Sequence, residues 1–307
     1  MPYVRPDVAN LLAMLAAQPG PKLSEITPAE GRAMMSGMTQ MLERPRGEIT
    51  TTDMVIPGDI KARLYTPADP AGHVLVYYHG GGWVIGDLDT HDPLCAEIAR
   101  QLGMRVVSID YRMAPEAPFP AATEDCLAAA RWIAGSPAEL GGAVTSVIPA
   151  GDSAGGNLAA AVTRELCGEI AIPAQWLIYP ATDMTEAEGS MAEFADGYLL
   201  TKDSMDWFQG HYMKGSEAKL LHPWASPLHA ETLDGLPPTL VFTCGLDPLR
   251  DQGRAYAARL IQHGVRGVYR EAAGQIHGCF TLRMGIPSAH DDLLGCITDL
   301  KLLLAGA

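Results

Sequence analysis

Paired cysteines are missing from this sequence. Its six cysteines are scattered over 307 residues, and no two of them stand at the close spacing of a metal-binding or redox pair. This distribution argues against a disulfide framework and against a zinc module. Unpaired cysteines of this kind are typical of reduced core residues, so we expect a cytoplasmic protein.

Long apolar runs are also missing. No stretch approaches the roughly 20 residues that a membrane-spanning helix needs, so we expect no membrane insertion. Residues 1–20 contain an apolar patch at residues 11–17, but it has neither a basic leader nor a clear cleavage context. We therefore interpret this segment as amphipathic and not as a signal peptide.

Positive charge is scarce. Lys and Arg number 22 against 36 Asp and Glu, which gives a formal net charge of −14. So acidic a chain is a poor partner for nucleic acid or an anionic membrane. No group of His, Cys, Asp and Glu has the spacing of metal ligands, so we predict no metal site.

A glycine-rich pentapeptide, Gly151-Asp152-Ser153-Ala154-Gly155, lies between a predicted strand and a predicted helix. Residues 144–149 are apolar and β-branched, and residues 157–166 are rich in helix formers. Gly-x-Ser-x-Gly in this context is the nucleophile-elbow pattern. The tight turn needs small neighbours and presents the serine hydroxyl at the N-terminus of the helix. We therefore predict that Ser153 is a nucleophile.

The rest of the chain alternates strands and helices. A hairpin over residues 49–56 and 60–65 precedes apolar strands at 73–78, 104–109, 144–149, 174–179, 239–243 and 265–271. Further helices are predicted at 92–102, 123–134, 251–262 and 289–304. This order predicts an α/β fold whose mostly parallel, eight-stranded sheet carries helices on both faces.

Two parts of the chain do not fit this alternation. Residues 1–45 have helical patterns, with a capping box at Thr27 and Glu30, and residues 184–222 are helical and aromatic. We interpret both as a helical cap over the carboxyl ends of the strands. The predicted domains are therefore 1–45 and 184–222 for the cap, and 46–183 and 223–307 for the core.

A serine nucleophile needs a base and an acid that orients the base. After the elbow, the acid and then the histidine should each follow a late strand. Asp247 follows the strand at 239–243, and His277 follows the last strand on a loop with flanking glycine. Asp251 is an alternative acid, although it is also placed to begin the next helix, and Asp183 is a second alternative.

The loop after the strand at 73–78 is His79-Gly80-Gly81-Gly82-Trp83. Successive glycines allow backbone amides to approach a substrate closely. We predict that the N–H groups of Gly81, Gly82 and Ala154 form an oxyanion hole. A phosphate-binding loop is the alternative, but the chain lacks Gly-Lys-Ser/Thr and has no Gly-x-Gly-x-x-Gly that opens a helix.

These motifs together resemble the hormone-sensitive lipase family of α/β-hydrolases, also called bacterial family IV esterases. Besides the elbow and the 79–83 loop, the matching segments are Asp110-Tyr111-Arg112-Met113-Ala114-Pro115-Glu116, Phe119-Pro120-Ala121-Ala122, Asp247-Pro248-Leu249-Arg250-Asp251 and His277-Gly278, with Asp7-Val8, Leu11-Leu12, Gly197-Tyr198-Leu199-Leu200-Thr201 and His211-Tyr212 in the predicted cap. The aspartate before Ser153 resembles the Gly-Asp-Ser-Ala-Gly subgroup. Two positions depart from the family pattern: Gln252 replaces a usual acidic residue, and Cys279 separates Gly278 from Phe280.

The resemblance implies an α/β-hydrolase fold and a serine carboxylesterase that acts on short- to medium-chain esters through an acyl-enzyme. It implies a small-molecule ester substrate, no cofactor and a family in which homodimers are frequent. We add Trp83, Leu200 and Phe280 as predicted substrate-pocket residues. An amidase or formamidase using the same residues is one alternative. A non-enzymatic ligand receptor of the same fold is another, although receptors of that kind lose the histidine that is present here.

Overall fold

One mixed sheet of eight strands forms the centre of the molecule. The computed structural model describes residues 2–306. Its strands are β1 (Thr50–Ile56), β2 (Ile60–Thr66), β3 (Ala71–Tyr78), β4 (Met104–Asp110), β5 (Ser146–Asp152), β6 (Gln175–Ile178), β7 (Thr239–Leu246) and β8 (Gly267–Ile276). They lie in the order β1-β2-β4-β3-β5-β6-β7-β8, with β2 antiparallel to both neighbours and all other neighbours parallel. The predicted α/β fold and its mostly parallel sheet are confirmed.

The opening hairpin has the turn that its sequence predicts. Ile56 pairs with Ile60 across the loop of residues 57–59. Gly58 and Asp59 have φ of 92° and 59°, and residues with positive φ are usual in the turns that join antiparallel strands. The hairpin places β2 against β4 and leaves β1 at one edge of the sheet.

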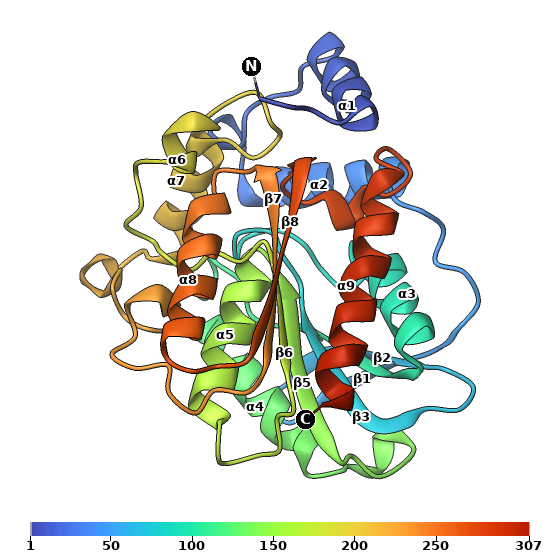
Figure 1. Ribbon diagram of the computed structural model, residues 1–307. Coiled ribbons are helices and arrows are strands. Elements are labelled where there is room, and N and C mark those ends of the chain that lie inside the picture. Colours follow the sequence, from blue (N-terminus) through green and yellow to red (C-terminus); the bar gives the residue numbers. More distant parts are fainter. Residues whose placement is uncertain (1, 307) are drawn as a thin grey trace.

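Helices cover both faces of the sheet because the central strands are apolar on both sides. On β3, Val74, Val76 and Tyr78 belong to one buried cluster, whereas Leu75 and Tyr77 belong to the other. Figure 1 shows α3 and α9 on one face of the sheet and α4, α5 and α8 on the other. These helices are α3 (Asp92–Leu102), α4 (Ala121–Ala134), α5 (Ala154–Leu166), α8 (Arg250–Gln262) and α9 (Ser288–Ala305).

The last two strands run further than the sequence pattern predicts. β7 extends to Leu246 and β8 to Ile276, because a change of register between Cys244 and Leu246 lets the pairing resume with Ile276. Glycines weaken the apolar pattern at Gly245 and Gly274, which is why the sequence suggested earlier ends. As a result, Asp247 and His277 each follow directly on the end of a strand.

The remaining helices lie beyond the carboxyl ends of the parallel strands, as Figure 1 shows. They are α1 (Pro6–Ala17), α2 (Pro28–Leu42), α6 (Ser190–Glu193) and α7 (Lys202–Tyr212). Elsewhere along the chain, short 3-10 turns are η1 (Leu23–Glu25), η2 (Ala138–Leu140), η3 (Glu217–Lys219), η4 (Pro227–His229) and η5 (Cys279–Thr281). The capping box predicted at the start of α2 is present, with Thr27 and Glu30 bonding each other's backbone N–H. Within residues 2–306, no helix is both long and apolar enough to cross a membrane.

Candidate active site

The serine predicted as nucleophile stands on a strained turn. β5 ends at Asp152 and α5 begins at Ala154, so Ser153 alone makes the turn, with φ 56° and ψ −118°. A non-glycine residue in this conformation costs on the order of 1–3 kcal/mol and persists only where its surroundings fix it. The N–H of Ser153 donates to the carbonyl of Ile178 on the neighbouring strand (2.8 Å).

Glycine at position 155 is required by close packing. A Cβ on Gly155 would lie 1.8 Å from the carbonyl oxygen of Tyr78, at the end of β3. The elbow therefore rests directly on the strand that leads into the glycine-rich loop. This contact sets the height of the serine relative to that loop.

The structure brings the three predicted catalytic side chains together. His277 Nε2 lies 2.9 Å from Ser153 Oγ, and His277 Nδ1 lies 2.7 Å from Asp247 Oδ2. Asp247 is fully buried, and its second oxygen accepts the N–H of Leu249 (2.8 Å). One carboxylate oxygen is thereby left to orient the imidazole. This is the geometry of a Ser-His-Asp triad.

The two alternative acids lie elsewhere. Asp251 pairs with Arg250 and Arg254 at 2.8 and 2.9 Å and accepts the N–H of Ser190 (2.9 Å). Asp183 bonds Thr185 and pairs with His229 at 3.0 Å. Both carboxylates hold loops and helix ends, and neither bonds His277 among the described residues.

The predicted oxyanion loop presents free amides. Among residues 2–306, no protein acceptor takes the N–H of Gly81, Gly82 or Ala154, whereas the N–H of Gly80 donates to Asp152 Oδ1 (2.8 Å). Gly81 and Gly82 have φ of 109° and 60°. A Cβ at Gly81 would meet the carbonyl oxygen of Ile85 at 2.1 Å, and one at Gly82 would meet the Phe208 ring at 2.2 Å. Glycine is therefore required at both positions.

A buried polar cluster beneath this loop was missed in the sequence. Asp152 accepts hydrogen bonds from Gly80 N–H and the Tyr77 hydroxyl (2.9 Å). His91 Nε2 lies 3.3 Å from Asp152 Oδ1, within ion-pair distance but outside hydrogen-bond geometry. Burial by itself would raise the pKa of Asp152, but His91 and the hydroxyl of Tyr77 bring that pKa below its ordinary value.

The cluster also contains His79. Burial, together with the charge of His91, lowers the pKa of His79 to about 4. The ring of His79 stacks on Tyr111 at 4.3 Å, and its Nδ1 lies 2.8 Å from the carbonyl oxygen of Gly80. The acidic residue inside the elbow and the histidine that opens the glycine loop were the available signals, because buried polar side chains beside a site need partners.

The predicted pocket residues occupy different surroundings. Trp83 is buried and stacks on Tyr212 of α7 at 4.3 Å with nearly parallel rings. Phe280 is buried against Phe242 at 4.7 Å. Leu200 is half-buried and packs at the edge of the apolar cluster that contains Trp83. Their roles as pocket residues stay predictions.

The two departures from the family pattern are both buried. Gln252 Oε1 accepts the N–H groups of Thr182 and Asp183 (2.5 and 2.9 Å), which a carboxylate could also do, while its Nε2 donates to Glu186 (3.0 Å). Burial raises the pKa of Glu186, the partner of that amide.

Cys279 lies with its sulfur 3.8 Å from that of Cys244, and burial raises the pKa of both thiols. Within residues 2–306, no three His, Cys, Asp or Glu side chains gather closely enough to hold a metal ion.

The chain is similar to known ester hydrolases over most of its length. A family model described as the α/β hydrolase fold matches residues 75–281. The carboxylic ester hydrolase LipN of Mycobacterium tuberculosis is 43% identical over 82% of this chain and 70% of its own length. The ethyl acetate hydrolase of Pseudomonas putida is 36% identical over 79% of this chain and 78% of its own.

Solved structures agree with this relationship. A thermostable esterase from Pseudomonas putida superimposes with a TM-score of 0.92 at 33% identity, over 99% of this chain and 98% of its own. A hyperthermophilic esterase from the archaeon Pyrobaculum calidifontis superimposes with a TM-score of 0.89 at 36% identity, over 99% of both chains. The chain therefore belongs to the hormone-sensitive-lipase-like esterases of the α/β-hydrolase fold family.

Proposed function

We propose that this protein is a serine carboxylesterase for short- to medium-chain esters and that Ser153, His277 and Asp247 carry the reaction. The observation that supports this best is the continuous series of short contacts from Asp247 through His277 to the strained Ser153. A serine hydroxyl becomes a nucleophile when a neighbouring imidazole removes its proton during attack.

The reaction then follows from this geometry. Ser153 Oγ attacks the acyl carbon while His277 Nε2 takes the hydroxyl proton. The resulting oxyanion accepts hydrogen bonds from the N–H groups of Gly81, Gly82 and Ala154. His277 returns the proton to the departing alcohol and leaves an acyl group on Ser153. A water activated by the same imidazole releases the carboxylic acid and restores the serine.

The helical segments at the carboxyl ends of the strands are proposed to form a cap of residues 1–45 and 184–222 on a core of 46–183 and 223–307. Two contacts that join the cap segments support this division. Ser24 in η1 donates to Asp203 in α7 (2.7 Å), and Gly31 of α2 lies against Trp207 of α7. Such a roof excludes water from the oxyanion hole and limits the acyl chain.

The finer expectations of a homodimer, a cytoplasmic location and membership of the Gly-Asp-Ser-Ala-Gly subgroup are part of this proposal. All six cysteines are free and five are buried, which suits a reducing compartment. β8 is an edge strand of the sheet and offers unpaired backbone groups to a second copy. Sedimentation of the purified protein tests the dimer.

Trapping the acyl-enzyme tests the catalytic assignment. We expect a p-nitrophenyl ester to release a burst of p-nitrophenol and to add one acyl group to the peptide that contains Ser153. Ser153→Ala should fold normally and lose turnover by about 10⁴- to 10⁶-fold. Wild-type turnover in that variant would refute the assignment. A matched panel of aryl esters and anilides distinguishes an esterase from an amidase.

A further inference from the structure

The histidine loop, defined here as residues 277–287, connects the end of β8 to the start of α9. It carries His277 and the short η5 turn, and it has no regular pairing of its own with the sheet. A loop of this kind needs anchors if its first residue is to hold a fixed position. In this chain, the anchors at both ends come from residues 3–43, far away in the sequence.

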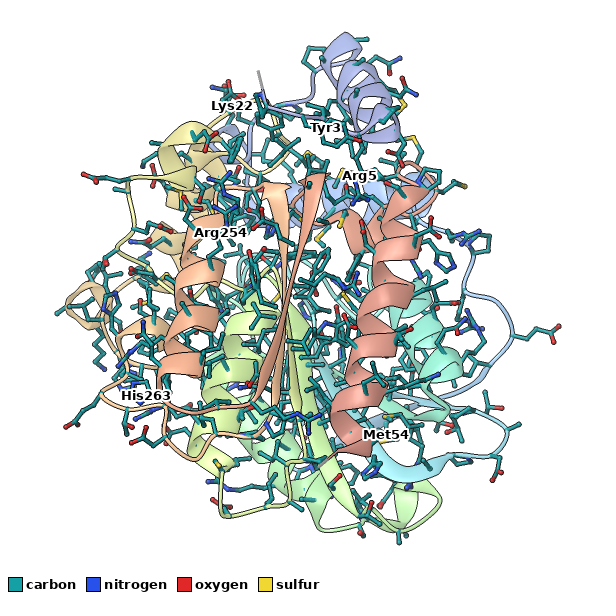
Figure 2. The ribbon with its side chains drawn as sticks, viewed as in Figure 1. Tyr3, Arg5, Lys22, Met54, Arg254 and His263 are labelled. Atoms are coloured by element: carbon teal, nitrogen blue, oxygen red, sulfur yellow. The ribbon has the colours of Figure 1, made fainter. Side chains whose placement is uncertain are left out.

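The first anchor holds the chain just before His277. The N–H of Arg5 donates to the carbonyl of Gly274 (3.2 Å), and its Nε donates to the carbonyl of Ala273 (2.9 Å). The same guanidinium bonds both oxygens of Asp292 at 2.6 and 3.1 Å. Figure 2 shows Tyr3 and Arg5 beside the end of β8, where a Cβ on Gly274 would lie 2.8 Å from the Tyr3 ring.

The second anchor holds the far part of the loop through a buried ion pair. Arg283 Nε lies 2.7 Å and Nη2 lies 2.6 Å from Glu43 Oε1. The N–H of Arg283 also donates to the second oxygen of Glu43 (3.2 Å). Both side chains are only 2% exposed. Next to them, the carbonyl of Leu42 accepts the N–H groups of Met284 and Gly285 at 2.8 and 3.0 Å.

Among the described residues, neither Glu43 nor Arg283 bonds Ser153, His277 or Asp247. The ion pair lies at the C-terminal end of α2, where Glu43 ends the helix, and it joins residues 240 positions apart. Removing two charges from water is expensive, so a buried pair is weak evidence for stability. In some proteins such pairs fix one conformation. His277 lies six positions before Arg283 in the chain, and its imidazole needs a fixed position to act as the base.

We propose that Glu43 and Arg283 are positioning residues that fix the histidine loop and thereby the imidazole of His277. This inference rests on the proposed function of His277 as the base. Only residues 278–282 separate His277 from Arg283, and Cys279, Phe280 and Leu282 among them are buried. A shift of Arg283 is therefore transmitted along a short, packed segment, and a misplacement of about 1 Å at a catalytic group costs about 10²-fold in rate.

The test removes both charges together, because removal of one would leave the other buried and unpaired. In Glu43→Gln/Arg283→Met we expect kcat on a p-nitrophenyl ester to fall at least tenfold while KM changes less than threefold. The proton that His277 Nδ1 shares with Asp247 should move or broaden in the low-field ¹H NMR spectrum. Arg283→Lys keeps the charge but loses the planar guanidinium, so its kcat should lie between those of the wild type and the double variant.

A control removes a more exposed bidentate pair that does not contact the histidine loop. Arg131 of α4 bonds both oxygens of Glu169 at 2.6 and 2.9 Å. Arg131→Met/Glu169→Gln should retain kcat, KM and the low-field signal. If the control loses as much kcat as the test variant, the loss is a general consequence of ion-pair removal and the inference is wrong.

The remaining outcomes are also decisive. An unchanged kcat and an unchanged low-field signal in a folded Glu43→Gln/Arg283→Met would overturn the inference, as would a rise in KM alone. Should that variant not fold, Arg283→Lys decides, and wild-type kcat there overturns the inference. Failure of the proposed function is seen separately, as absence of Ser153-dependent turnover in the unmodified protein.

Discussion

The serine side and the histidine side of the site are built differently. The serine side consists of the elbow and the 79–83 loop, which leave adjacent strands that pair Tyr78 with Gly151. Backbone strain, glycines and one buried aspartate fix its geometry. The histidine side depends on side chains from the distant N-terminal segment, through Arg5 and the Glu43–Arg283 pair.

The difference shows two ways of holding a reacting group in place. Local strain needs few residues, and it tolerates almost no substitution because a Cβ would collide with backbone. Long-range anchors use ordinary side chains, and each can be changed with partial loss. We therefore expect changes on the serine side to act sharply and changes around the histidine loop to act in steps.

The largest expected effect tests the acid within the histidine side. Asp247→Asn keeps the shape of the side chain but favours the wrong imidazole tautomer, so turnover should fall by about 10⁴-fold. In Asp251→Asn, turnover should fall less than tenfold, since Asp251 pairs with arginines at the start of α8. Steady-state kinetics on one short ester checks both variants, and the opposite ranking would exchange their roles.

The next effect tests the rigidity of the serine side. Gly82→Ala would place a methyl group 2.2 Å from the Phe208 ring in a left-handed conformation. The loop must shift, and loss of oxyanion contacts should lower kcat by about 10²- to 10³-fold. Gly210→Ala in α7 is the control, because no atom lies within 4 Å of its added Cβ. Equal activity of the two variants would show that the loop is not rigid.

A smaller effect is expected for the N-terminal segment as a whole. Deletion of residues 2–40 removes α1 and most of α2, including Arg5. Turnover of a short ester should fall more than tenfold and more than the folded fraction measured on the same sample, because both the roof and one loop anchor are lost. A soluble truncated protein with full activity would contradict the cap and the first anchor together.

The smallest effect is on stability, and it tests whether the serine side depends on an uncharged His79. The folded pKa of about 4 lies below the unfolded value near 6.5, so the unfolded chain binds the proton first as pH falls. Stability is therefore complete above pH 6.5 and is lost towards pH 4, by about 3 kcal/mol in all. Urea unfolding at several pH values gives the free energy of unfolding as a function of pH. Between pH 6.5 and 4 this free energy should fall less steeply in His79→Asn than in the wild type.

The serine side and the histidine side also differ in how much of each could be predicted from the sequence. The elbow and the glycine loop are short segments whose chemistry is local, so Ser153 and Gly82 stand out in one sequence. Asp247 and His277 were placed by their position after strands, and the structure puts both within bonding distance of one another. The contacts of Glu43 with Arg283 and of Tyr212 with Trp83 depend on tertiary packing and leave no pattern that one sequence reveals.

The contact of α7 with the glycine loop bears on how substrate range could be altered by mutagenesis. Libraries that randomise the 184–222 segment would include Phe208, which lies on Gly82, and Tyr212, which stacks on Trp83. Changes at these two positions disturb the glycine loop, so a screen would first recover variants that restore the loop and only then variants with a new substrate. A library restricted to half-buried neighbours such as Met205 and Gln209 leaves both of these loop contacts unchanged.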